Sequence, residues 1–366
     1  MNQRSLRRSF TLLSTIGVIV LGTQAYASTL TQNMSWTIDR AGTSAKYRVT
    51  AYGDSIYAGY NTSLFEEALF AAPTVDADYL QNKWNADMES IRRCKSGALA
   101  SGVYNEKIVN ERSYMQTSNT RVVTFEMCGN DGLQARSNLK GQSGACNFGV
   151  LDTALNNCTT YQNAAMSYIN ANKGANVRVK AISNLFYPGY NADNVNSSCY
   201  DPATGSPVNM RNKFLPYLAK MNWRACNTAN TYGFVCVDSF ANFMGADYDS
   251  NGDGQIDSNA LKYVQGESEA AYVTRITSTL KSTIRDANTH YASSTTSYDY
   301  IQSDDTHPTY AGGTVGTGIW PGGDASGSGP PDLPDSSYVG GKTSFWNRYG
   351  HERMGWALSV FNPATP

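Results

Sequence analysis

Short apolar runs alternate along the chain with longer stretches of helical spacing. Residues 64–93 and 268–287 carry apolar side chains three and four positions apart, which predicts helices. The runs are near-continuously apolar, as expected of strands covered on both faces. They are residues 47–51, 121–127, 177–186, 233–237 and 297–302. Strands alternating with helical stretches predict an α/β sheet with helical crossovers.

The composition changes abruptly at residues 309–346, which are rich in Gly, Pro, Ser and Asp. Such a segment predicts a loop or lid and not a helix. No internal repeat is present, and no second segment has an evident core of its own. We therefore expect one domain, residues 28–366, with insertions at 247–266 and 309–346.

The N-terminal residues have the pattern of a cleaved signal peptide, residues 1–27. Basic residues from Arg4 to Arg8 precede an apolar stretch at 10–22, and Ala25-Tyr26-Ala27 supplies a small-x-small cleavage site. The apolar stretch is shorter than the about 20 residues of a stable membrane span. A secreted or periplasmic protein is predicted, with an uncleaved anchor as the alternative.

The charge balance argues against one class of partner. The chain has 29 Lys and Arg and 30 Asp and Glu residues, and no basic stripe interleaved with aromatic residues. Nucleic acid is therefore not expected as a partner.

Seven cysteines accompany the export signal, and oxidising compartments favour disulfides. Three bridges and one free thiol are expected. The short-loop pairs are Cys146 with Cys158 and Cys226 with Cys236, with the third bridge drawn from Cys94, Cys128 and Cys199. Close Cys and His clusters are absent, which argues against a zinc site.

Candidate chemistry lies in two distant segments. Gly53-Asp54-Ser55 ends the first apolar run, and Asp304 precedes His307 by three residues. A serine on a tight turn exposes its hydroxyl, and a histidine with a nearby aspartate supplies a base and its orienter. This pattern predicts a serine esterase; the alternative for Ser55 alone is an ordinary Gly-Asp-Ser turn.

Three ordered blocks resemble those of the SGNH (GDSL) hydrolase family. They are residues 52–59 around Ser55, residues 125–131 ending in Asn130-Asp131, and residues 304–308 ending in His307-Pro308. The resemblance implies a three-layer α/β/α sandwich with a flavodoxin-like parallel sheet. It also implies that Ser55 attacks an ester carbonyl, His307 moves the proton and Asp304 orients the imidazole.

The resemblance further implies an oxyanion hole formed by the Ser55 backbone N–H and the Asn130 side-chain amide. Two departures from the family pattern are evident. Cys128 stands where the family commonly has glycine, so a disulfide is expected to tie that loop. The block that usually donates a glycine N–H is poorly matched near residues 109–113, where Arg112 takes the glycine position.

The insertion at 309–346 separates His307-Pro308 from residues 347–354, which ordinarily follow almost directly in this family. An insertion so near the catalytic histidine predicts a substrate-selecting or covering loop, the alternative being a passive decoration. The other histidines, His290 and His351, are expected to be structural or surface residues.

A separate pattern resembles a calcium loop, with oxygen donors at alternate positions and a glycine in the sixth. Its candidate ligands are Asp249, Asn251, Asp253, Gln255 and Asp257. The twelfth position is Ala260 and not an acid, and a metal-free acidic turn is the alternative. Any Ca²⁺ would be structural, because the triad needs no cofactor.

The sequence leaves the substrate open among small esters, lipids and acylated polysaccharides. A lipase-like esterase and a carbohydrate esterase are the two enzyme readings. A non-catalytic surface protein on the same fold is the third. Aromatic residues such as Tyr187, Tyr190, Trp320 and Trp346 suit sugar stacking and an acyl groove equally well.

Overall fold

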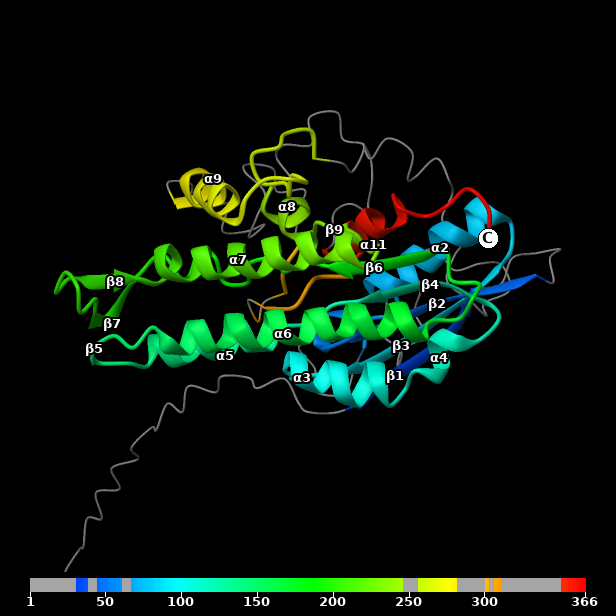
Figure 1. The fold of residues 1–366 in the computed structure, drawn as a ribbon, viewed down its shortest axis with the longest axis horizontal. Coiled ribbons are helices and arrows are strands. Elements are labelled where there is room, and N and C mark those ends of the chain that lie inside the picture. The colour runs from blue at the N-terminus through cyan, green and yellow to red at the C-terminus, as the bar shows by residue number, and fades with distance from the viewer. Residues whose placement is uncertain are drawn as a thin grey trace, which may run out of the picture.

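Six strands form the central sheet, in the order β1-β3-β2-β4-β6-β9 (Figure 1). β1 runs antiparallel to β3, and every other neighbouring pair is parallel. Counted in chain order, the parallel strands follow the flavodoxin-like order 2-1-3-4-5. The predicted α/β sheet is confirmed. The strands are β1 (Thr31–Ile38), β2 (Lys46–Gly53), β3 (Asp87–Lys95), β4 (Thr120–Phe125), β6 (Val179–Ser183) and β9 (Val235–Val237).

The computed structural model describes residues 31–38, 45–60, 67–245, 256–281, 300–302, 304, 306–310 and 350–366. The predicted signal peptide, residues 1–27, lies outside these ranges. So do His290, Trp320, Trp346 and all but two residues of the 309–346 insertion.

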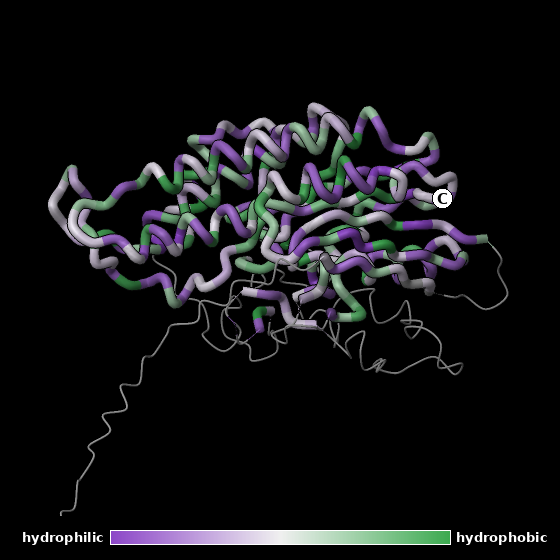
Figure 2. Tube along the Cα trace, turned by 90° about the horizontal axis from the view of Figure 1, so that it is seen from below, coloured by the Kyte–Doolittle hydropathy of each residue, from purple (hydrophilic) through white to green (hydrophobic). Residues whose placement is uncertain are grey.

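Helices cover both faces of the sheet. On one face α2 (Ala72–Trp84) packs on β2 and β3, and α11 (Gly350–Ser359) packs against α2 and α8 (Ser239–Met244). The other face carries the π-helical turn η1 (Val103–Val109), α6 (Gly149–Asn172) and α7 (Met210–Thr231). These layers make the predicted three-layer sandwich. Apolar positions concentrate where strands and helices meet (Figure 2).

Three helices reach beyond the sheet to a second, smaller sheet. α5 (Gly129–Lys140), α6 and α7 extend away from the six strands, and β5, β7 and β8 lie at their far end (Figure 1). α9 (Glu269–Lys281) packs on α7. The three short strands are β5 (Gly144–Ala145), β7 (Asn196–Tyr200) and β8 (Pro207–Asn209). The short helices are α1 (Ser55–Ala58), α3 (Ala100–Gly102) and α4 (Ser113–Gln116).

Four of the five predicted strands correspond to β2, β4, β6 and β9; of the fifth, only residues 300–302 are described. The helix predicted at 64–93 is wrong in its last part, because α2 ends at Trp84 and residues 87–95 form β3. Met88 and Ile91 are three residues apart, a spacing that suits a helix locally. Pairing with β1 and β2 decides for a strand, since tertiary context overrides local propensity.

Three disulfides and one buried free thiol, Cys94, are present, as expected. Cys226–Cys236 is confirmed, but the predicted Cys146–Cys158 pair is wrong. β5 pairs with β7, which brings Cys146 beside Cys199. Cys158 on α6 instead bridges to Cys128 at the start of α5. Tertiary packing of α5 on α6 thus outweighs the shorter loop.

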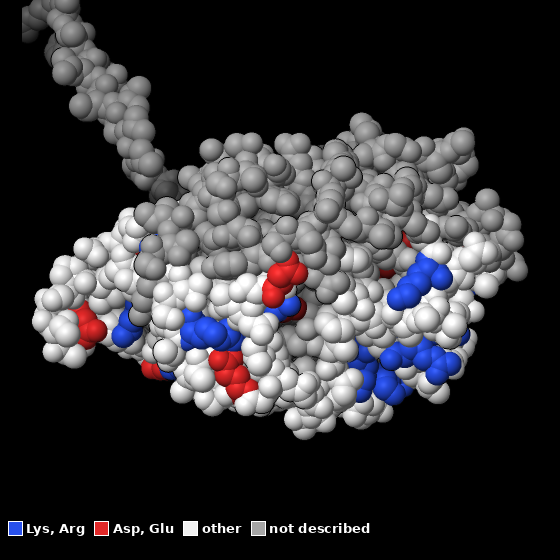
Figure 3. Space-filling view, turned by 90° about the horizontal axis from the view of Figure 1, so that it is seen from above, with Lys and Arg blue, Asp and Glu red and all other residues white. Residues whose placement is uncertain are grey.

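The surface of the described part carries both signs of charge. On the face seen in Figure 3, Lys and Arg residues gather toward one end and acidic residues lie among them near the middle. Among the atoms coloured in that view, no continuous basic stripe appears. None of the described helices is long and apolar enough to cross a membrane.

Candidate active site

Ser55 lies at the carboxyl end of β2, beside β4, where the strand order reverses. In sheets of this type that edge is where ligands bind. Asp54 caps α1 by accepting from the Ile56 N–H (2.9 Å), and Gly59 ends the helix with a φ of 77°. A left-handed φ is open to glycine at little cost. The four-residue helix therefore begins at the predicted nucleophile.

Glu126 lies beneath this turn. Its Oε1 accepts from the backbone N–H of Asp54 (2.6 Å) and more weakly from that of Tyr57 (3.4 Å). A Cβ on Gly53 would meet Glu126 Oε1 at 2.3 Å, so only glycine fits there. Glu126 falls within the block at residues 125–131, but the sequence assigns it no role. The available signal was a single carboxyl between apolar Phe125 and Met127, directly after β4.

The three side chains predicted to form a triad lie in one hydrogen-bonded chain. His307 Nε2 is 2.9 Å from Ser55 Oγ, and His307 Nδ1 is 2.5 Å from Asp304 Oδ2. Asp304 Oδ1 also accepts from the backbone N–H of Thr306 and His307, each at 3.0 Å. The carboxylate therefore fixes both the imidazole and the turn that carries it.

Backbone contacts with Ile301 and Gln302 hold the His307 segment in place. Ile301 and Pro308 form an antiparallel bridge, and Gln302 N donates to His307 O (2.8 Å). The ring of Tyr60 lies beside the imidazole, with centroids 4.6 Å apart. Tyr60 N donates to Ser55 O at 3.0 Å, so this residue links the serine and histidine segments. Sequence reasoning missed it, because nothing in its neighbours marks it.

The electrostatics of Asp304 favour its charged form. Burial acts to raise the pKa of this carboxyl, but the hydrogen bond and charge of His307, with two backbone amides, hold the pKa below its usual value. Asp304 is thus ionised at neutral pH. When the ring is neutral, the ionised carboxylate holds the ring proton on Nδ1. Nε2, which faces Ser55 Oγ, is then unprotonated.

The Ser55 backbone N–H is available for a ligand. The neighbouring N–H groups of Asp54, Ile56 and Tyr57 are taken by the Glu126 and Asp54 side chains. Within the described ranges, the Ser55 N–H has no such acceptor. A free N–H beside a hydroxyl nucleophile is the position an oxyanion donor requires.

Asn130 lies beside the turn, at the start of α5. Its Nδ2 donates to Asp54 Oδ2 (3.1 Å) and to the backbone oxygen of Ala98 (3.0 Å). The amide is therefore fixed in direction by two acceptors, and it lines the same pocket as Ser55. Its role as an oxyanion donor stays a prediction.

Cys128 adopts the backbone conformation that glycine would supply. Its φ is 87°, it caps α5, and its sulfur bridges to Cys158 on α6. A non-glycine residue in this region costs on the order of 1–3 kcal/mol, and the conformation persists only where its surroundings hold it there. The expected disulfide at the departure from the family pattern is thus present.

The structure does not bring Arg112 to the pocket that Ser55 and Asn130 line. It caps α4, is exposed, and its guanidinium donates to Val109 O at 3.4 Å. The chain at 109–119 runs back toward the start of β4, where Asn119 O accepts from Arg48 N. The loop after β3 supplies the backbone next to Asn130 instead, through Ala98. The assignment of Arg112 as an oxyanion donor is therefore corrected.

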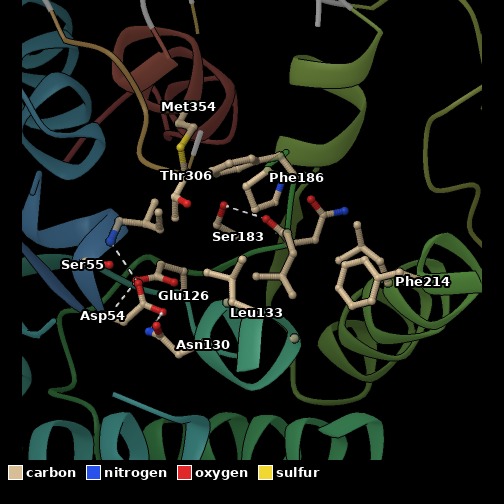
Figure 4. A pocket seen from close by; sticks show the side chains of 17 residues that line it. Asp54, Ser55, Glu126, Asn130, Leu133, Ser183, Phe186, Phe214, Thr306 and Met354 are labelled. Carbon is tan, nitrogen blue, oxygen red and sulfur yellow. Dashed lines mark hydrogen bonds between the residues drawn. The ribbon is translucent and has the colours of Figure 1, made fainter. Parts of the chain in front are cut away.

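A pocket opens beside Ser55, with an empty volume of about 610 Å³ that is continuous with solvent. In Figure 4, Asp54, Ser55, Glu126 and Asn130 line one side of it. The rest of the lining is mostly apolar, with Ser183, Asn184 and Thr306 as polar members. Its apolar side chains include Leu133, Leu185, Phe186, Pro188, Phe214 and Leu218. The arrangement places a polar reacting end next to an apolar chamber.

The predicted metal ligands Asp249, Asn251, Asp253 and Gln255 lie outside the described residues, and Asp257 is exposed. Across the ranges that the structure covers, no group of three His, Cys, Asp or Glu residues is arranged to hold a metal ion. His351 is buried on α11 and accepts from Ala72 N (3.4 Å); burial lowers its pKa to about 3. It has the structural role expected of it.

No protein-family model matches the chain, and no curated protein matches its sequence. Solved structures similar to it include a lipase from a goat rumen metagenome, 20% identical over 56% of this chain and 86% of its own, with a TM-score of 0.41. A phospholipase A1 from Streptomyces albidoflavus is 17% identical over 63% of this chain and 98% of its own, with a TM-score of 0.36.

An acetyl xylan esterase from Geobacillus stearothermophilus is 14% identical over 56% of this chain and 81% of its own, again with a TM-score of 0.36. The identities are low and the superpositions partial. The chemistry of this chain is therefore inferred from the geometry of Ser55, His307 and Asp304, and not from these similarities.

Proposed function

We propose that the protein is a serine carboxylic-ester hydrolase. The observation that carries this proposal is the continuous hydrogen-bonded chain from Ser55 through His307 to Asp304. The chain lies at the carboxyl edge of a flavodoxin-like sheet, next to a free backbone N–H and a pocket. A hydroxyl, a base, an orienting carboxylate and an oxyanion donor are the parts that acyl transfer needs.

The reaction proceeds in two halves. Ser55 Oγ attacks the ester carbonyl carbon while His307 Nε2 takes the hydroxyl proton, and the carbonyl oxygen becomes an oxyanion held by the Ser55 N–H. The bond to the alcohol then breaks, with His307 returning the proton to the leaving oxygen. An acyl-enzyme remains. Water attacks it in the same way, with His307 as base, and releases the acid and free Ser55.

Asn130 is the second donor of the proposed oxyanion hole. Its amide is already directed by Asp54 and Ala98, so an oxyanion would share the hydrogen now given to Ala98 O. Loss of one such donor lowers kcat by about 10²–10³ in enzymes of this type. Asp304 stabilises the imidazolium that forms when His307 carries the proton.

The pocket supports esters with an apolar acyl group. The side opposite Ser55 presents aliphatic and aromatic side chains, including Phe214 and Leu133. Burying a methylene there gains about 0.8 kcal/mol. A bare acetyl group would leave most of that apolar surface unused. Esters with longer acyl chains are therefore favoured over acetylated polysaccharide.

Export is the second part of the proposal. Three disulfides are typical of proteins that fold in an oxidising compartment, in agreement with the signal peptide predicted at residues 1–27. The structural Ca²⁺ predicted from residues 249–257 remains a separate proposal, outside the chemistry.

The deciding experiment is hydrolysis of nitrophenyl esters from acetyl to palmitoyl by the mature protein, by Ser55→Ala and by Ser206→Ala. Ser206 is exposed and lies beside the small sheet, so its variant should match the wild type. Ser55→Ala should lower kcat by about 10⁶, as for nucleophile loss in other serine hydrolases. A wild-type rate no higher than that of Ser55→Ala on every ester would overturn the proposal and favour a binding role.

A further inference from the structure

Two carboxyl groups lie buried in contact beneath the nucleophile turn. Glu126 Oε1 accepts from the Asp54 backbone N–H at 2.6 Å, and the two residues are only 1% and 2% exposed. Neither belongs to the Ser55, His307 and Asp304 chain. Burial of two acids side by side is costly unless they do something that apolar residues cannot.

The pair fixes the direction of the backbone around Ser55. Glu126 Oε1 takes the N–H of Asp54 and, more weakly, that of Tyr57, and Asp54 Oδ1 takes the N–H of Ile56. Of these successive amides, only that of Ser55 has no acceptor among the residues that the structure describes, which leaves it for a ligand. The two carboxyls thus select which N–H faces the pocket.

The pair also fixes Asn130, since Asp54 Oδ2 accepts from its amide at 3.1 Å. A continuous path therefore runs from Glu126 through Asp54 to both proposed oxyanion donors. Removal of the Glu126 carboxyl would release the Asp54 amide and loosen the carboxylate that holds Asn130. Misplacement of such donors by even 1 Å is known to lower rates about 10²-fold.

One proton is shared between the two acids, because two desolvated carboxylates in contact cannot both be charged. Both oxygens of Asp54 already accept from N–H donors, which stabilises its charge. The backbone donors to Glu126 fall on Oε1 alone, which leaves Oε2 to carry the proton. Burial and the Asp54 charge raise the pKa of Glu126 well above its usual value.

The surroundings do not reverse this assignment. The positive charges of Arg92 and Lys107 act to lower the pKa of the Cys94 thiol, which lies next to the pair. The His307 imidazole acts to lower the pKa of Asp54. The titratable or charged groups that face the two carboxyls are His307, Asp131, Tyr57 and Cys94.

We propose that Glu126, in its protonated form, is the positioning residue of the nucleophile turn. It accepts from the backbone with one oxygen and donates its proton to the Asp54 carboxylate with the other. This inference rests on the proposed function, because positioning has meaning only for a reacting Ser55. It predicts that a neutral side chain with one donor and one acceptor can replace Glu126.

The test compares Glu126→Gln and Glu126→Ala on the best nitrophenyl ester, with Glu106→Gln as the control. Glu106 is paired with Lys95 at the surface, away from the turn. Because glutamine offers both a donor and an acceptor, Glu126→Gln should keep kcat within about fivefold. Glu126→Ala should lower kcat about 10- to 100-fold through lost charge-assisted hydrogen bonds, with little change in KM.

The pH profile of kcat adds a readout that a purely structural role would not move. The wild type should lose activity at alkaline pH as Glu126 ionises beside Asp54, and Glu126→Gln should lack that part of the loss. If Glu126→Gln falls as far as Glu126→Ala, or if Glu126→Ala keeps full kcat, the proposal is wrong. If Glu126→Ala does not fold, Glu126→Gln alone decides.

Two measurements separate failure of this inference from failure of the proposed function. An infrared difference spectrum of the wild type against Glu126→Gln at pH 7 should contain the carbonyl band of a protonated carboxyl. A carboxylate band there overturns the inference. Labelling of Ser55 by a fluorophosphonate probe should be slower in Glu126→Ala. Both measurements remain decisive even if no ester is hydrolysed.

Discussion

His307 Nε2 lies 2.9 Å from Ser55 Oγ, although the two residues are 252 positions apart in the chain. Ser55 follows the first parallel strand, and His307 comes from a segment close to the last helix, α11. The sheet and its two outer layers hold these ends together. The contact is thus a property of the whole fold, and each prediction below tests a part of what maintains or uses it.

Asp304→Asn should lower kcat by about 10³–10⁴ with little change in KM, because an amide at Nδ1 favours the wrong imidazole tautomer. Steady-state kinetics on one ester would measure this. Combined with Ser55→Ala, the change should add almost nothing, since residues that act as a unit are non-additive. Equal, additive losses would show that Asp304 acts outside this chain.

Phe214→Ala should move the acyl preference to longer chains. The ring lies in the apolar side of the pocket, 3% exposed, and the position of a Cβ on Gly132 is 3.3 Å from its Cζ. Its removal opens space equal to most of a phenyl group. The kcat/KM values for the ester series should show the shift.

Phe234→Ala is the matched control for the pocket prediction. Phe234 is equally buried but packs against Phe125, with ring centroids 5.9 Å apart, and does not line the pocket. Both variants should lose about 3–5 kcal/mol of stability. An unchanged chain-length preference in Phe214→Ala, or the same shift in Phe234→Ala, would contradict the assignment of the acyl chamber.

The Cys128–Cys158 bridge should matter for activity as well as for stability. It closes a loop of 30 residues, and its loss in Cys128→Ser/Cys158→Ser should cost about 3–4 kcal/mol. Cys128 also begins the helix that carries Asn130, in a left-handed conformation. We expect kcat to fall about tenfold at a temperature where the variant is folded.

Cys146→Ser/Cys199→Ser provides the comparison, because that bridge ties β5 to β7 at the far end of the extended helices. Its loss should lower stability by a similar amount and leave kcat unchanged. Urea unfolding and kinetics on both double variants would decide. A fall in kcat common to both would mean that the loss is general and not local to Asn130.

Asp76→Asn should stabilise the protein at neutral and alkaline pH. Burial raises the pKa of Asp76 from 3.8 to about 7, and one of its oxygens has no hydrogen-bond partner among the described residues. Its folded pKa lies above the unfolded one. The stability it gives at low pH is therefore lost as pH rises from about 4 to about 7.

The substitution removes this dependence. Asn362 donates to Asp76 at 2.5 Å and has a buried oxygen without a partner in the described part of the chain, so it can accept from the new amide. The gain in the free energy of unfolding should be about 1–4 kcal/mol at pH 8 and near zero at pH 4. Urea titrations at the two pH values measure it. A gain that is equal at both would reject the titration of Asp76 as its cause.

Local sequence was sufficient for the elements that are buried on both faces. The runs at 47–51 and 121–127 are covered by helices on either side, so their apolar character is near-continuous and predicts β2 and β4. The same pattern did not predict β3. Met88 and Ile91 are three residues apart, which is a helical spacing, and the polar residues Ser90 and Arg92 are buried as well. Only the neighbouring strands determine that segment.

The candidate site divides in the same way. Ser55, Asp304, His307 and Asn130 belong to short blocks whose residues are close in sequence, and the structure brings the four together. Glu126 and Tyr60 act through contacts that depend on how strands and turns meet. Local sequence marks Glu126 only as a lone carboxyl and gives no signal for Tyr60. The assignment of Arg112 as an oxyanion donor was wrong because the chain turns away from the site before β4 begins. The Cys146–Cys158 pairing failed because loop length is a weaker guide than helix packing.

The Cys128–Cys158 bridge makes the protein depend on whether its compartment is reducing or oxidising. A reduced chain still has its serine, histidine and aspartate, but the start of α5 lacks its covalent tie to α6. In a reducing cytoplasm the proposed hydrolase would therefore be held below full activity, among the cell's own esters. Oxidation after export would complete it. A structural crosslink would then also serve as a safeguard for the cell that makes the enzyme.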